Sequence, residues 1–308
     1  MIILKTVNLF KRFNQIIAIN NINLEIEKGK IIGIIGPDGA GKSTLLRLLA
    51  GLLKPTSGSV IFKEIEIAKF PSKIKEKIGY MPQHFSLYGD LTVFENLKFF
   101  ADLYQISREK FKKKVEELLN FSRLKAFKNT LARNLSGGMQ KKLALACSLF
   151  HTPEILLLDE PTTGVDPISR KELWQLLYQL NNQGVTILFT TPYMDEAQKC
   201  QKVGLIHEGQ LLAYENPEKL IKEMKEEIIE LITEEKEIRT KLKNWPELKN
   251  IYPYGDTLHL VFKAGKVKIE EIKNRLENQK IAIKSIRKIT PSFEDVFFSL
   301  IQKIKTEN

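Results

Sequence analysis

The stretch that decides the fold is Ile31-Ile-Gly-Ile-Ile-Gly-Pro-Asp-Gly-Ala-Gly-Lys-Ser-Thr44. Residues 31–35 predict a buried strand, and a helix is expected to begin at Thr44, after a glycine-rich loop. The loop fits the pattern G-x-x-x-x-G-K-[ST], in which main-chain N–H groups and a helix N-terminus surround a phosphate. A nucleoside triphosphate site is therefore predicted, with contacts from Gly36, Pro37, Asp38, Gly39, Ala40, Gly41, Lys42, Ser43 and Thr44.

Side chains of the loop itself and of two later strand ends point to the chemistry at this site. Lys42 can reach the β and γ phosphates, and the Ser43 hydroxyl can bind Mg²⁺. Asp159 and Glu160 end an apolar strand, at the edge where open α/β sheets bind ligands, which argues against an ordinary exposed acidic pair. Gln83 follows another strand, and its amide can reach both metal and water. We expect Mg²⁺ at Ser43, Gln83 and Asp159, and catalytic roles for Gln83 and Glu160.

A second glycine-rich helix start occurs at Leu135-Ser-Gly-Gly-Met-Gln140. Ser136 is placed to cap the helix that follows. Together with the main chain of Gly137 and Gly138 it could bind another phosphate.

The rest of the first 218 residues alternates strands and helices. Residues 2–8 and 16–26 predict an antiparallel pair, with Phe13 in the connection between them, and residues 59–67 predict one further strand. Residues 84–150 predict a mostly helical region, whose first helix is opened by the capping box Thr92-x-x-Glu95. Alternating strands and helices after it indicate an α/β core with a parallel sheet.

The composition changes near residue 216, and residues 225–308 predict a second, smaller domain. Its expected order is βαββαβ, the ferredoxin-like arrangement, followed by a helix capped at Ser292. This domain could sense a ligand, hold a dimer together or shield a membrane partner. We favour contact with a dimer mate or partner, and a packing appendage without a ligand is the alternative.

Composition limits the partners. The chain has 308 residues, 48 basic and 37 acidic, for a net charge of +11. This excess of positive charge could indicate binding to nucleic acid or to an anionic membrane. Because the lysines are scattered along the sequence, we favour lysines spread over solvent-exposed faces and expect no nucleic-acid partner. Cys147 and Cys200 lack metal-ligand spacing and suggest reduced, cytosolic thiols. Lys5 interrupts the N-terminal apolar run, and no run of about 18 apolar residues occurs, so another chain should supply any membrane span.

Taken together, these motifs resemble the ATP-binding subunit of an ATP-binding-cassette (ABC) transporter, over residues 1 to about 215. The resemblance rests on Gly36–Thr44, Gln83, Leu135–Gln140, Ile155–Glu160 and Gly164-Val-Asp-Pro167. It implies an α/β P-loop NTPase cassette with a parallel core sheet, an antiparallel N-terminal sheet and a helical subdomain. It also implies a head-to-tail homo- or heterodimer, in which the phosphate loop of one cassette and the signature Ser136–Gly138 of the other enclose ATP.

The resemblance also suggests further roles. Asp166 would link the two sites, and Phe13 would stack on adenine, although a core phenylalanine is the alternative. Residues 84–91 would dock an integral membrane permease and so hold the chain in the cytoplasm, at the inner face of the cell membrane. Thr290–Phe297 and Thr190–Ala197 resemble the subfamily of drug, antibiotic and polysaccharide exporters, which favours export over import.

Two positions depart from the family pattern. Asp38 occupies a loop position where asparagine or serine is common, and its side chain is expected to turn away from the phosphates. Pro192 stands where the family normally has a histidine that contacts the γ-phosphate. Losing such a donor costs about 10²–10³ in turnover. A degenerate module that completes a partner's site is therefore an alternative to a transport ATPase. A soluble ABC ATPase that acts on ribosomes or nucleic acid is a third hypothesis, and the presence of only one cassette in this chain disfavours it.

Overall fold

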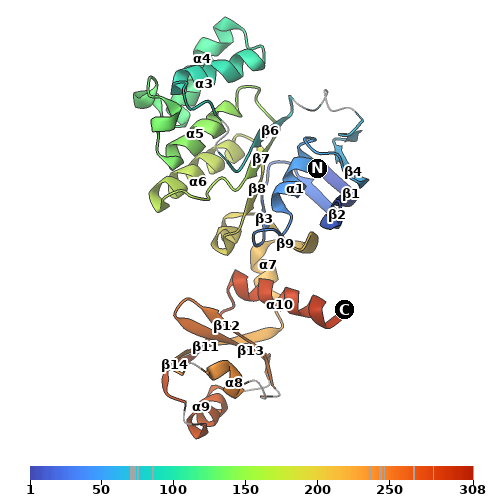
Figure 1. Ribbon diagram of the computed structural model, residues 1–308, viewed down its shortest axis with the longest axis vertical. Coiled ribbons are helices and arrows are strands. Elements are labelled where there is room, and N and C mark those ends of the chain that lie inside the picture. The colour runs from blue at the N-terminus through green and yellow to red at the C-terminus, as the bar shows by residue number, and fades with distance from the viewer. Residues whose placement is uncertain are drawn as a thin grey trace. The chain divides into compact units, whose positions relative to one another are not determined.

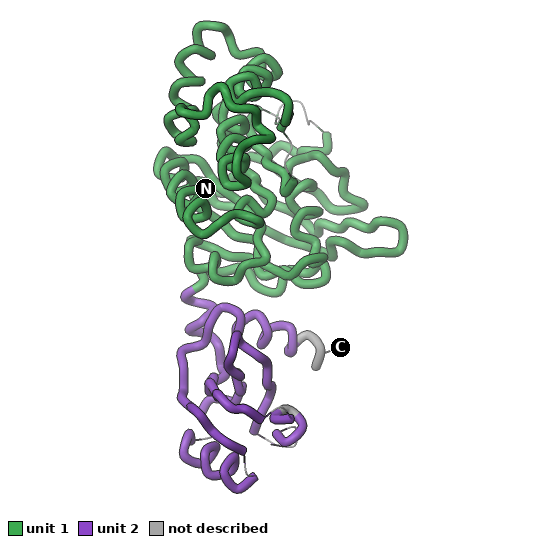
Figure 2. Tube along the Cα trace, turned by 60° about the vertical axis from the view of Figure 1, so that its left-hand side comes forward, with its two compact units in different colours: residues 1–217 green, residues 218–308 purple. Residues whose placement is uncertain are grey.

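The computed structural model describes residues 1–69, 74, 76–84, 87–235, 237–242, 245, 247–265, 268–279 and 281–307. The chain forms two compact units, Met1–Pro217 and Glu218–Asn308, shown in different colours in Figure 2. In the described part of the chain, no helix combines the length and the apolar character needed to cross a membrane.

The first unit contains an antiparallel sheet in the order β2-β1-β4-β5. Its strands are β1 (Ile2–Phe13), β2 (Ile16–Glu27), β4 (Ser57–Phe62) and β5 (Ile65–Glu66). β1 continues past residue 8 because Asn8, at φ 46°, absorbs an irregularity in its pairing with β2. Phe13 therefore ends a strand, and its expected place in the connection was wrong. The single strand expected at 59–67 is two strands, because Lys63 and Glu64 turn the chain with positive φ.

A six-stranded sheet in the order β10-β9-β3-β8-β7-β6 forms the centre of this unit. It contains β3 (Ile31–Ile35), β6 (Ile78–Met81), β7 (Ile155–Asp159), β8 (Thr186–Thr191), β9 (Lys202–His207) and β10 (Gln210–Glu215). All pairings are parallel except β9 with β10. β3, β7 and β8 are buried along their whole length, as expected for strands covered on both faces. Their carboxyl ends lead to the residues of the predicted site.

Helices complete the cassette. They are α1 (Lys42–Leu49), α3 (Val93–Leu103), α4 (Arg108–Phe121), α5 (Gly137–Cys147) and α6 (Pro167–Asn182), with the short 3₁₀ helices η1 (Lys125–Phe127), η2 (Ala132–Asn134) and η3 (Met194–Lys199). In Figure 1, α3 and α4 lie at one end of the unit, with α5 and α6 between them and the sheet. The Thr92 capping box is present. α1 begins two residues before the predicted Thr44. The parallel sheet, antiparallel sheet and helical region confirm the expected cassette.

The second unit has the predicted βαββαβ order. After α7 (Pro217–Lys222) come β11 (Glu226–Thr233), α8 (Ile238–Leu242), β12 (Leu248–Tyr254), β13 (Thr257–Lys263), α9 (Ile269–Asn278), β14 (Ile283–Ile289) and α10 (Phe293–Glu307). The sheet order is β12-β13-β11-β14 with antiparallel pairings, which confirms the ferredoxin-like arrangement. Ile229 and Leu231 of β11 share a buried cluster with Ile272 and Leu276 of α9.

Candidate functional site

The loop between β3 and α1 has the backbone that a phosphate loop requires. Gly41 lies at φ 102°, and a Cβ there would come within 2.4 Å of the Ala18 carbonyl oxygen, so glycine is needed. Lys42 folds back over the loop and donates from Nζ to the carbonyls of Gly36 (2.9 Å) and Pro37 (3.0 Å). All nine predicted loop residues, 36–44, therefore lie in one continuous segment that ends in the first turn of α1.

Lys42 also connects this loop to the end of β7. Its Nζ lies 3.2 Å from Glu160 Oε1, and both side chains are only 4% exposed. Asp38 Oδ1 lies 3.5 Å from the same nitrogen, while the Asp38 side chain is 90% exposed. That exposure agrees with the expectation that Asp38 turns outward, but its contact with Lys42 was not predicted. The lysine thus stands between the loop and the carboxylate, within reach of a phosphate held there.

Gln83 and Glu160 are brought together from the ends of β6 and β7. Gln83 Nε2 donates to Glu160 Oε2 at 2.8 Å, and Thr163 Oγ1 donates to the same oxygen at 3.2 Å. The Glu160 amide donates to Thr190 Oγ1 at 3.0 Å. Glu160 has φ 47°, a conformation that costs a non-glycine residue about 1–3 kcal/mol and persists only where neighbours enforce it. These contacts fix a carboxylate beside the phosphate loop.

The residues expected to bind Mg²⁺ are arranged in a way that suits a bound cation. Ser43 Oγ donates to Asp159 Oδ1 at 2.9 Å, and Thr190 Oγ1 donates to the same oxygen at 2.7 Å. Asp159 is fully buried, and its Oδ2 has no hydrogen-bond partner. Buried polar atoms normally have partners, and Mg²⁺ prefers oxygen ligands of this kind. The amide of Gln83, the third expected ligand, contacts Glu160.

The second glycine-rich motif forms the start of α5. Ser136 is the N-cap, and its Oγ accepts from the Met139 amide at 3.3 Å, as predicted. Ser136 and Gly137 are exposed, whereas Gly138 is buried against Ser169, where a Cβ would come within 2.4 Å. A cavity of about 230 Å³ separates this helix start from Gln83. The exposed N-terminus of α5 is thus open to a molecule outside this chain.

Phe13 and Asp166 are both on the surface. Phe13 is 43% exposed, with Lys11 Nζ 4.9 Å from its ring centroid, so the core alternative for this residue was wrong. Asp166 caps α6, accepting at Oδ1 from the Ser169 amide (2.9 Å) and the Ile168 amide (3.1 Å). These hydrogen bonds, that of Ser169 foremost, hold the pKa of Asp166 below its usual range.

The sequence reasoning missed Thr190 and Lys141. Thr190 lies directly opposite Asp159 in the β7–β8 pairing, so the rule that polar residues gather at the carboxyl edge could have identified it. Lys141 donates from Nζ to the Gln83 carbonyl oxygen at 2.6 Å. No local signal predicts that contact, because it depends on how α5 packs against the end of β6.

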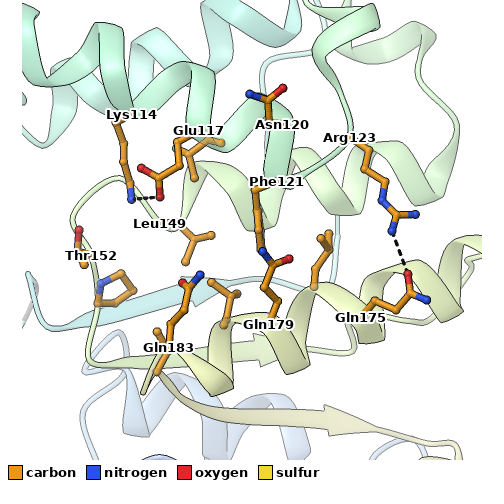
Figure 3. A pocket seen from close by; sticks show the side chains of 15 residues that line it. Lys114, Glu117, Asn120, Phe121, Arg123, Leu149, Thr152, Gln175, Gln179 and Gln183 are labelled. Carbon is orange, nitrogen blue, oxygen red and sulfur yellow. Dashed lines mark hydrogen bonds and ion pairs between the residues drawn. The ribbon is translucent and has the colours of Figure 1, made fainter.

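A larger cavity, of about 510 Å³, lies elsewhere, between α4 and α6. Its lining includes Asn120 and the amides of Gln175, Gln179 and Gln183 (Figure 3). Pro153 and Val185 also line it, and each precedes a strand of the parallel sheet. The cavity is therefore at the amino ends of β7 and β8, opposite the edge that carries Asp159 and Glu160.

Comparisons with known proteins agree with this geometry. A family model described as "ABC transporter" matches residues 19–163. The probable multidrug ABC transporter ATP-binding protein YbhF of Escherichia coli is 41% identical over 288 residues, covering 92% of this chain and 49% of that protein. The chain thus spans about half the length of that relative. The Nod factor export ATP-binding protein I of Ralstonia nicotianae is 31% identical over 303 residues, covering 97% of this chain and 93% of that protein.

Among solved structures, a similar one is a dimeric ATP-binding cassette in a post-hydrolysis state, bound to ADP and Pi. It is 32% identical, has a TM-score of 0.63, and covers 69% of this chain and 98% of that chain. The similarity to this structure is therefore confined to about two thirds of the chain, whereas the similarity to the two sequence relatives also takes in much of the second unit.

Proposed function

The chain belongs to the ABC transporter family, as an ATP-binding cassette, and we propose that it binds and hydrolyses ATP to drive export through a separate membrane subunit. The observation that carries this proposal is the convergence of Ser43, Gln83, Asp159 and Glu160 beside the phosphate loop. They come from α1 and from the ends of β6 and β7, and they supply the metal-binding oxygens and the general base that phosphoryl transfer needs.

Each side chain has a task in this proposal. The loop amides and Lys42 bind the phosphates, and Glu160 orients a water molecule and accepts its proton. The water oxygen bonds to the γ-phosphorus as the bond to the β–γ bridging oxygen breaks. Gln83 and Thr163 hold the Glu160 carboxylate in place. Mg²⁺, held by Ser43, Asp159 and Gln83, would neutralise phosphate charge.

The exposed position of the signature supports a head-to-tail dimer. Ser136 and Gly137 are exposed, and they lie on a different helix from the phosphate loop of the same chain. A second cassette, identical or different, would bring its own loop to them. The similar solved structure is itself a dimer. Phe13, exposed at the end of β1, would stack on adenine, and Asp166 would face the partner.

The membrane subunit would dock near residues 84–91. Residues 85 and 86 lie outside the described residues, but Tyr88 is 50% exposed and its ring meets Phe99 edge-on at 4.6 Å. Leu103, one turn further along α3, is 61% exposed. Buried Asn96 fixes the main chain here through both Tyr88 and Leu91. This ordered apolar surface suits a helix of a permease, which would hold the chain at the inner face of the cell membrane.

The proposal is tested by ATP turnover of the purified full-length chain with Mg²⁺, using Glu160→Gln as the control. We expect turnover in the wild type, none in Glu160→Gln, and ATP-dependent dimers that persist in the variant because hydrolysis cannot release them. If both the wild type and Glu160→Gln bind ATP but neither hydrolyses it nor forms dimers, the proposal that the chain is an ATPase is contradicted. For docking, Tyr88→Asp and Leu103→Asp should release the chain from membranes of its own cells without weakening ATP binding.

A further inference from the structure

Lys141 connects the two residues proposed to carry out hydrolysis, and it does so through their main chains. Its Nζ lies 2.6 Å from the Gln83 carbonyl oxygen and 3.4 Å from the Glu160 carbonyl oxygen. The side chains of Gln83 and Glu160 remain free to meet each other. One ammonium group therefore holds both backbones while leaving the reacting groups unobstructed.

The position of Lys141 is energetically demanding. Burial lowers the pKa of Lys141, while the carboxylates of Glu160 and Asp159 act in the opposite direction. Glu160 has positive φ, and the peptide groups on its two sides are bonded by different side chains, its N–H by Thr190 and its C=O by Lys141. A strained backbone held at both ends is typical of a site whose geometry must not relax.

Lys141 is also part of the signature helix. It lies five residues after Ser136, a rise of about 7.5 Å along α5. Leu143, Leu145 and Ala146 of the same helix are fully buried, so α5 is anchored as a body. A displacement at the exposed start of α5 would thus reach Gln83 and Glu160 through one side chain.

We propose that Lys141 is a positioning residue that holds Gln83 and Glu160 in register and couples them to the signature motif on the same helix. This inference rests on the proposed function, because the signature is taken to engage ATP bound by a second cassette. Binding of Ser136 and Gly137 to ATP on the second cassette would then change the position of Glu160 in this chain. In this way the two hydrolysis sites would respond to each other.

The test uses the full-length chain with Lys141→Met, which removes the donor but keeps an unbranched side chain, and Lys141→Arg, which keeps a cationic donor. Lys142→Met is the matched control, because Lys142 is the next lysine of α5 and pairs with Glu172 at 2.6 Å instead. We expect Lys141→Met to lower kcat on the order of 10²-fold, with nearly unchanged affinity for a fluorescent ATP analogue. Lys141→Arg should recover most of kcat, and Lys142→Met should lose stability but keep kcat.

A second measurement does not depend on turnover. Amide hydrogen exchange without nucleotide should become faster at residues 79–84 and 158–164 in Lys141→Met, and stay unchanged there in Lys142→Met. Unchanged exchange at both segments would overturn the positioning role, whatever happens to kcat. If the wild type does not hydrolyse ATP, the proposed function fails. The hydrogen-exchange result then decides by itself whether Lys141 positions Gln83 and Glu160.

Coupling is read from the ATP dependence of the rate. A cooperative wild type that becomes non-cooperative in Lys141→Met, but not in Lys142→Met, supports the connection between signature and catalytic pair. A wild type without cooperativity, or cooperativity that survives in Lys141→Met, would overturn this connection.

Discussion

At the residue scale, Asp159 gives the main structural argument for a bound cation. Its carboxylate is fully buried, Oδ1 accepts from two hydroxyls, and Oδ2 has no hydrogen-bond partner. Leaving a charged oxygen in this state is costly unless a cation satisfies it. This unpaired carboxylate oxygen therefore supports a metal at the site independently of the sequence motif.

The corresponding prediction concerns Mg²⁺. Asp159→Asn should raise the Mg²⁺ concentration needed for half-maximal ATP turnover, because it removes the negative charge but preserves the shape and the hydrogen bonds at Oδ1. The measurement is turnover against Mg²⁺ at fixed ATP. An unshifted Mg²⁺ dependence in Asp159→Asn would show that this carboxylate does not hold the metal.

Pro192 is one of the two positions that we expect to depart from the family pattern, and it is the one that bears on turnover. Thr191 pairs with Ile35, and the Gly36 amide donates to the Thr191 carbonyl oxygen at 3.3 Å. The chain therefore leaves β8 directly beside the phosphate loop. A histidine at 192 would have its imidazole near the phosphates, whereas proline offers no donor there.

We therefore expect Pro192→His to raise turnover, by up to about 10²-fold, in line with the cost of one missing transition-state donor. Pro192→Ala is the control, because it removes the ring without adding a donor and should stay at the wild-type rate. The measurement is kcat at saturating ATP. Fast wild-type turnover that Pro192→His leaves unchanged would mean that another group already does this work.

At the element scale, Glu196 joins three segments around the site. It is fully buried, and its carboxylate accepts from Arg170 Nε and Trp174 Nε1 of α6 (2.9 Å each) and from Thr162 Oγ1 after β7 (3.0 Å). Glu196 itself belongs to η3, the helix that follows Pro192. The Glu196 carboxylate thus connects three segments: the loop that follows Glu160, helix α6 and the segment after β8.

Glu196→Ala should lower the free energy of unfolding by about 3 kcal/mol, because it leaves a guanidinium, an indole N–H and a hydroxyl without their acceptor. Urea denaturation of the full-length chain measures this, with Glu196→Gln as an intermediate case that keeps one acceptor. Asp195→Ala is the control, since Asp195 bonds the same arginine from an exposed position. A loss in Glu196→Ala no larger than that in Asp195→Ala would argue against the buried junction.

The elements that the sequence predicted are those with strong local signals. The apolar run of β3, the capping box at Thr92 and the βαββαβ order all follow from patterns within a few residues. The errors are local too: Asn8 carries β1 onward through an irregular pairing, and a turn at Lys63 divides the strand expected at 59–67. Contacts of Lys141 and Glu196 could not be predicted, because they join segments that meet only through tertiary packing.

At the scale of the whole molecule, each of the two units contains a buried apolar cluster of its own. In the first, the leucines of α1 share a buried cluster with strands of both sheets. In the second, Trp245, Leu260 and Phe262 pack with α9 in another cluster. The second unit, residues 218–308, has a length within the usual range of domains that fold independently.

Residues 218–308, expressed alone, should therefore unfold cooperatively, and residues 1–217 alone should bind a fluorescent ATP analogue about as well as the full-length chain. The reason is that the phosphate loop, Gln83, Asp159 and Glu160 all lie in the first unit, which has a buried apolar cluster of its own. Calorimetry of each piece and nucleotide titration of the first test this. Leu260→Ala in the isolated second unit is the control, because it should lower the transition temperature if the cluster around Phe262 is the core. If the isolated second unit shows no cooperative transition, or the isolated first unit does not bind the nucleotide analogue, the two units stabilise each other. Residues 218–308 would then act, at least in part, by supporting the fold of the cassette.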